Sequence, residues 1–172
     1  MKTPDKYYNE TKNAFATSDE KKIIYKLNDI RQNGTPSIIP LIVELLEKHN
    51  KDAIEKVVLE IMGQLKDNEC RPFVIESIKR LKTDEIRKKL IMTCWQSGLN
   101  YSDYIIDFAR EFIDGNFEVS IESFTVIEEW MHETPKETVV ACKTYLKENV
   151  HKIPNDKKAY YSELVKLVES HI

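Results

Sequence analysis

Apolar residues recur along this chain at the three- and four-residue intervals that are typical of amphipathic helices. After Ser18, residues Ile23, Leu27 and Ile30 would share one helix face. Gly34 then predicts a helix stop in the left-handed backbone conformation. No stretch alternates apolar and polar residues as a half-buried strand would. About ten helices with short, antiparallel connections are therefore predicted, in hairpins over residues 4–32, 36–65, 70–97, 102–132 and 135–171.

Equivalent apolar positions repeat from one hairpin to the next. In the second helices, one column is separated by 32, 32 and 33 residues and consists of Leu27, Leu59, Ile91 and Phe124. A second column has the same separations and consists of Ile30, Met62, Cys94 and Ile127. The first helices carry two further columns at separations of 32, 31 and 33, namely Val43, Ile75, Ile106, Val139 and Leu46, Ile78, Ala109, Cys142. Four columns with one shared period indicate repeated structural units.

Such columns predict stacking, because a small hairpin must bury its apolar face against the equivalent face of its neighbour. We therefore expect an all-α fold, an α-α superhelix or solenoid of about five hairpins with a period near 32 residues. Residues 1–172 would form a single repeat domain. An irregular helical bundle whose spacings coincide by chance is the alternative.

A Pro- and Leu-containing run at residues 39–46 is followed by an acidic turn at Asp52 and by the sequence Gly63-Gln64-Leu65-Lys66-Asp67. In this pattern, residues 36–98 resemble the HEAT repeat family, a group of armadillo-type superhelices. The period is shorter than the roughly 40 residues usual for HEAT. Only Arg87 matches the arginine that often follows the turn, where Glu55 and Ser120 stand in the other repeats. A tetratricopeptide assignment lacks its signature residues, and an armadillo repeat needs a third helix for which there is no room.

Charge and cysteine content narrow the functional classes. The 172 residues carry a net charge of −3, whereas nucleic-acid binding usually requires a basic excess. No apolar run approaches the length of a membrane span, and the first residues lack the apolar core of a signal peptide. The three cysteines have no CxxC spacing, which favours reduced thiols and a cytoplasmic protein. Nucleic-acid and membrane partners are thus not expected.

The sequence shows no pattern that predicts catalysis. The four histidines are not spaced as metal ligands, either among themselves or with the cysteines. The four glycines are dispersed, so no phosphate-binding loop is predicted, and the chain has no Gly-x-Ser-x-Gly motif. We therefore expect no catalytic residue, no metal site and no cofactor.

The HEAT resemblance implies a concave face lined by the second helix of each hairpin. A helical wheel assigns one stripe of these helices to that face, away from the core positions. The candidate partner-binding residues on it are Arg31, Glu60, Lys88, Met92, Trp95, Thr125 and Glu128. Trp95 and Met92 would form an apolar patch, and tryptophan is enriched at binding hot spots. Alternatively, Trp95 lies over Gly63 of the preceding repeat and only fills space.

These observations favour a non-enzymatic scaffold that binds an unidentified protein or peptide through the second-helix face, as a monomer or a homodimer. The alternative is a HEAT-like nucleic-acid-binding protein, because some alkylpurine DNA glycosylases resemble HEAT-type solenoids. Such enzymes use a basic concave groove, whereas the candidate stripe mixes Arg31 and Lys88 with Glu60 and Glu128.

Overall fold

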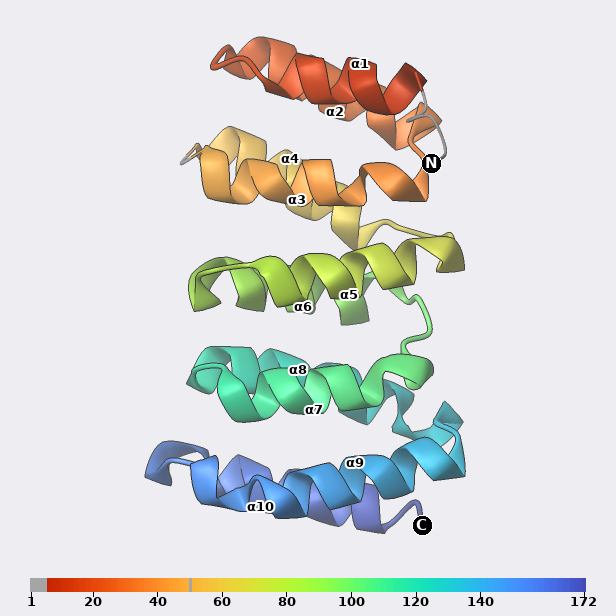
Figure 1. The fold of residues 1–172 in the computed structure, drawn as a ribbon, viewed down its shortest axis with the longest axis vertical. Coiled ribbons are helices and arrows are strands. Elements are labelled where there is room, and N and C mark those ends of the chain that lie inside the picture. The colour runs from red at the N-terminus through yellow and green to blue at the C-terminus, as the bar shows by residue number, and fades with distance from the viewer. Residues whose placement is uncertain (1–5, 50) are drawn as a thin grey trace. The chain divides into compact units, whose positions relative to one another are not determined.

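A computed structural model describes residues 6–49 and 51–172 of the chain (Figure 1). Within these residues the backbone forms ten α-helices, joined by turns that often contain a short 3₁₀ helix, and no strand. The predicted all-α fold class is confirmed. The helices are α1 Lys6–Phe15, α2 Glu20–Asn33, α3 Ile39–Lys48, α4 Asp52–Gly63, α5 Arg71–Arg80, α6 Asp84–Ser97, α7 Ile105–Asp114, α8 Phe117–Trp130, α9 Lys136–Glu148 and α10 Lys158–Glu169.

Contacts gather the helices into two compact units that divide between Leu81 and Lys82. In the first unit, α3 packs against α1 and α5 to form one layer, and α2 packs against α4 to form another. The pairs α1–α2 and α3–α4 join the two layers. Six of the ten α3 residues are buried, so this helix provides the centre of the first core.

The second unit repeats the same two-layer plan. Helix α7 packs against α9, while α8 packs against both α6 and α10. Contacts of α7 with α8 and of α9 with α10 join the layers. The aromatic side chains of Phe108 and Phe112 on α7 are fully buried, so α7 is the core of this unit as α3 is of the first. In each unit, one layer thus contains the first helices of the predicted hairpins and the other layer contains the second helices, as stacked hairpins would.

The repeat columns are largely buried. All members of two columns are buried, namely Ile30, Met62, Cys94, Ile127 and Leu46, Ile78, Ala109, Cys142. Leu59, Ile106 and Phe124 in the other two columns are only partly buried. Ten helices with this periodic burial among the described residues are compatible with a helical repeat.

The expected left-handed stop at Gly34 is wrong. Its φ is −68°, in the extended region, whereas Gly98 after α6 has a φ of +70°. Glycine is needed at position 34 for another reason, because an added Cβ would lie 2.6 Å from the Ile30 carbonyl oxygen. The residue therefore permits a close backbone approach at the end of α2 rather than a special φ.

A buried lysine closes the C-terminal end of α7. Lys157, which precedes α10, is 2% exposed. Its Nζ donates hydrogen bonds of 2.8, 2.9 and 2.8 Å to the carbonyl oxygens of Phe112, Ile113 and Gly115. These carbonyls lie where a helix leaves its acceptors unpaired and where a cation is favoured. Burial lowers the pKa of Lys157, and the three acceptors compensate for the lost hydration.

Replacement of this lysine tests the contribution of the buried ammonium group. Lys157→Met should lower the free energy of unfolding by about 2–4 kcal/mol, because it leaves buried carbonyl oxygens without donors. Urea unfolding followed by circular dichroism measures the loss. The matched control is Lys158→Met, since Lys158 is exposed and adjacent. Equal effects of the two substitutions would contradict the assigned role of Lys157.

A carboxylate attaches α1 to α2. Asp29 on α2 accepts hydrogen bonds from the Tyr7 hydroxyl and the Lys26 ammonium, both at 2.7 Å, and from the Asn33 amide at 2.9 Å. The Lys26 Nζ also lies 3.9 Å from the centre of the Tyr7 ring. The hydrogen bonds from Lys26, then Asn33 and Tyr7, lower the pKa of Asp29 to about 2.

This lowered pKa predicts an acid-sensitive attachment of α1. Asp29 stabilises the folded form above its unfolded pKa near 3.9, and the contribution disappears as pH falls through about 2. Carboxyl chemical shifts in an NMR titration should give the low pKa, with loss of Tyr7 contacts over the same range. In Lys26→Met, the Asp29 pKa should rise because the largest cause of the shift is absent. An unchanged value would show that Lys26 does not hold it.

Candidate partner-binding surface

The candidate residues fall into two groups, one in each unit. Arg31 on α2 and Glu60 on α4 belong to the first unit. Lys88, Met92 and Trp95 lie on α6 of the second unit, with Thr125 and Glu128 on α8 of the same unit.

In the first unit, the two candidate residues bind each other. The Arg31 Nη2 donates to the Glu60 carboxylate at 2.5 Å, and both side chains are partly exposed. The pair therefore bridges the neighbouring second helices α2 and α4. Exposed ion pairs of this kind contribute about 0–1 kcal/mol to stability, so the pair orients two side chains more than it strengthens the unit.

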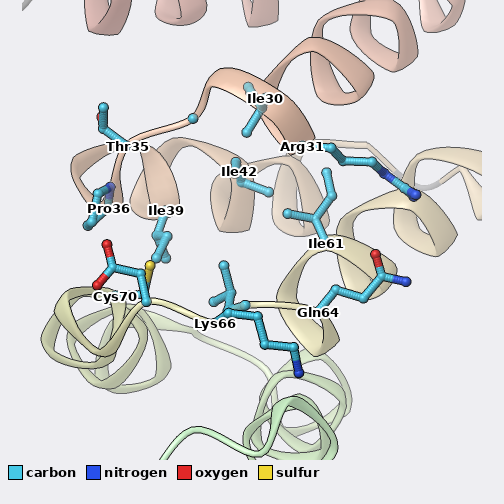
Figure 2. A pocket seen from close by; sticks show the side chains of 13 residues that line it. Ile30, Arg31, Thr35, Pro36, Ile39, Ile42, Ile61, Gln64, Lys66 and Cys70 are labelled. Carbon is cyan, nitrogen blue, oxygen red and sulfur yellow. The ribbon is translucent and has the colours of Figure 1, made fainter.

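A pocket of about 370 Å³ lies beside Arg31 in the first unit (Figure 2). Figure 2 shows Ile30, Ile42 and Ile61 gathered about it, while the Arg31 head group points away. On the opposite wall, Cys70 is 5% exposed. Burial, followed by the charges of Asp67 and Glu69, raises the pKa of Cys70 to about 11. The thiol is therefore neutral at pH 7 and poorly suited to nucleophilic attack.

In the second unit, a groove of about 220 Å³ runs between α6 and α8. Met92 and Ile121 provide its apolar lining. The Lys88 Nζ lies 2.7 Å from the Glu118 carboxylate, so an ion pair joins the two helices along the groove. The remaining lining residues are Lys89 and Glu122. This groove has room for about one side chain of a partner.

Trp95 lies on α6, one of the two helices that form this groove, and its side chain is 37% exposed. Its Nε1 donates a hydrogen bond of 2.9 Å to the Glu122 carboxylate on α8. This bond fixes the indole across the two helices while part of the ring stays in contact with solvent. Tryptophan at an interface commonly combines an apolar body with such a polar contact. Tyr25, which is 79% exposed on α2, has no comparable hydrogen bond among the described residues.

The two α8 candidates differ in their surroundings. The Thr125 hydroxyl donates to the Ile121 carbonyl oxygen at 3.1 Å, and the residue is partly buried. Glu128 is exposed, as is its neighbour Glu129. The structure thus brings Lys88 and Met92 into one groove, and it places Glu128 on the exposed surface of the neighbouring helix.

Sequence reasoning missed Glu118, Glu122 and Lys89. The 33-residue offset between Ile91 and Phe124 pairs Lys88 with Ile121 and Trp95 with Glu128. The observed pairs are Lys88–Glu118 and Trp95–Glu122, in which the acid lies three and six residues earlier on α8, or about one and two helical turns. Long side chains reach along the helix, whereas an alignment of Cα positions does not show this. Glu122 lies 27 residues after Trp95, and Glu118 lies 30 residues after Lys88. These spacings were the signal available in the sequence.

A carboxyl group with a perturbed pKa lies elsewhere in the second unit. Burial raises the pKa of Glu111 on α7, against the opposing charge of Arg87. The Arg87 guanidinium lies 3.5 Å from Glu111 and 2.7 Å from Asp84, so it joins α6 to α7. This arrangement is an ion-pair network between packed helices, which accounts for the shift without a catalytic role.

The thiols and acids of the described residues do not gather into a cation site. No group of three or more His, Cys, Asp or Glu side chains is positioned there to hold a metal ion. Burial raises the pKa of both Cys94 and Cys142 to about 12, which keeps these thiols protonated. Among the same residues, no helix has the length and apolar character needed to cross a bilayer.

Comparisons with protein-family models, curated proteins and solved structures give no match to this chain. The resemblance of residues 36–98 to HEAT repeats therefore rests on the sequence pattern alone.

Fluorescence can measure the exposure of the indole. In a Trp130→Phe variant, we expect Trp95 emission to be readily quenched by acrylamide, because the ring is 37% exposed. Trp130 in the complementary Trp95→Phe variant should be quenched less, because its Nε1 is buried. Glu122→Gln should increase Trp95 quenching by weakening the interhelical hydrogen bond. Emission and quenching typical of a dry core would contradict the described surface.

Proposed function

We propose that this chain is a non-enzymatic, HEAT-like helical repeat that binds a protein or peptide through the second-helix face formed by α6 and α8. The observation that carries the proposal is Trp95, which is partly exposed and fixed by Glu122 on the same pair of helices as the Met92–Ile121 groove. An anchor in the groove and an aromatic contact beside it would suit one extended or helical segment of a partner.

The energetics of recognition favour this face. A few buried aromatic anchors carry most of the binding energy at interfaces, and Trp is prominent among them. Methionine adapts its shape to irregular apolar partners. The ion pair Lys88–Glu118 and the bond Trp95–Glu122 hold α6 and α8 together before any partner arrives, which reduces the entropy lost on binding.

Charge argues against the nucleic-acid alternative. The outer face of α8 carries Glu118, Glu122, Glu128 and Glu129. Lys88 on α6 is paired with Glu118, and Lys89 lies 3.5 Å from Glu85. A phosphate backbone would meet a surface with an acidic excess and be repelled. A salt-sensitive gel shift with DNA at low ionic strength would support the glycosylase-like alternative against our proposal.

The cellular setting forms part of the proposal. Cys70, Cys94 and Cys142 are buried and unpaired, in agreement with a reducing compartment, and we propose a cytoplasmic location. The same face would pair with a second copy if the protein forms a homodimer, and light scattering separates the two cases.

Selection from a random displayed peptide library tests the proposed face. We expect the full chain to select peptides whose binding falls at least tenfold in Trp95→Ala, because a hot-spot contact is removed. Tyr25→Ala is the matched control, since it removes another exposed aromatic ring far along the sequence on α2. If the selected peptides bind wild type and Trp95→Ala equally, the α6–α8 face is not the binding surface.

A further inference from the structure

We propose that the occupant of the α6–α8 face is a cationic segment, which places a lysine or arginine beside Trp95 and an apolar side chain between Met92 and Ile121. This inference rests on the proposed function and adds the chemistry of the partner. It follows from the distribution of charge along the groove and from the direction of the two helices.

The two ends of the face differ in charge. At the end where α6 and α8 begin, Lys88 is neutralised by Glu118 and Lys89 lies against Glu85. Further along, Glu122 accepts a hydrogen bond from the neutral Trp95 indole and forms no ion pair with a cation among the described residues. Among the described residues, no cation pairs with Glu128 or Glu129. Negative charge therefore accumulates towards the far end of the face.

Helices α6 and α8 run parallel, so their C-terminal ends lie together. At their beginnings, the Asn116 backbone N–H donates to the Asp84 carboxylate at 2.8 Å. Beyond their ends, the Asn100 side-chain amide donates to the Glu133 carboxylate. Unpaired carbonyls give each helix end a partial negative charge. Two such ends side by side add to the field of the nearby carboxylates.

The acidic residues occupy positions that disfavour the isolated helix. A helix is stabilised by basic residues in its last turn, yet neither α6 nor α8 has one. Instead α8 carries Glu128 and Glu129 just before its end at Trp130. Helix stability does not account for this pattern, whereas attraction of a cationic partner does.

Trp95 completes a site for a cation. Its ring is fixed by the bond to Glu122, and the exposed Glu128 and Glu129 follow further along the same helix, α8. A lysine or arginine over an indole face gains a cation–π interaction, which nearby carboxylates reinforce. The groove lined by Met92 and Ile121 then takes an apolar neighbour in the same segment. An acidic or phosphorylated segment would be repelled by the same charges.

The composition of the selected peptides decides the inference. Peptides whose binding depends on Trp95 should be at least twofold richer in lysine and arginine than the input library. Their binding should weaken several-fold between 50 and 300 mM salt, since exposed charges are screened. Trp95-dependent peptides without this enrichment would overturn the cationic partner and leave the proposed function standing. Absence of any Trp95-dependent peptide would overturn both.

A charge reversal separates binding from folding. The double variant Glu128→Lys/Glu129→Lys should bind the selected peptides at least tenfold more weakly, while its melting temperature stays equal or rises, because lysine suits a helix C-terminus. The control Glu137→Lys/Glu148→Lys makes the same charge change at exposed positions of α9 and should retain binding. Equal losses in the two double variants, or full binding in the first, would refute the proposed contact.

Discussion

Within each unit, the helices must bury their apolar faces against neighbouring helices, because two helices of 10 to 14 residues cannot enclose a core alone. Helix α3 shows the constraint most clearly, since it is buried on several sides by α1, α4 and α5. In the second unit, α7 has the same place between α8 and α9. Side chains that face neither neighbour are free of this constraint, and they are the ones available for recognition.

The sequence predicts the helices and much of the core because the same constraint acts on every pair of helices. Ile30 and Met62 are buried for the same reason, as are Ala109 and Cys142, and their spacing records it. Features that occur only once in the chain have no repeated spacing from which they could be predicted. A lysine is normally read as a surface residue, so the burial of Lys157 could not be predicted; its three acceptors lie 42 to 45 residues earlier. Gly34 was recognised as special, but for the wrong geometric reason.

The exposure of the candidate residues on α6 was predictable, but their contacts were not. The helical wheel assigns Lys88, Met92 and Trp95 to one exposed stripe of α6, and the structure leaves all three partly accessible. The contacts of Lys88 with Glu118 and of Trp95 with Glu122 were not predicted, because a helical wheel does not include the reach of side chains along the helix. The charge asymmetry of the face also required the structure, since it depends on the ion pairs Lys88–Glu118 and Lys89–Glu85.

The ammonium of Lys157 has a consequence for cooperativity. Arrays with only nearest-neighbour contacts tend to fray one hairpin at a time. Here the hairpin of α9 and α10 cannot peel away without stripping the donors from the end of α7, whose aromatic residues form the adjacent core. Unfolding of α9 and α10 is thereby coupled to the loss of hydrogen bonds at the C-terminal end of α7. Helices α7, α9 and α10 should consequently open as one cooperative block.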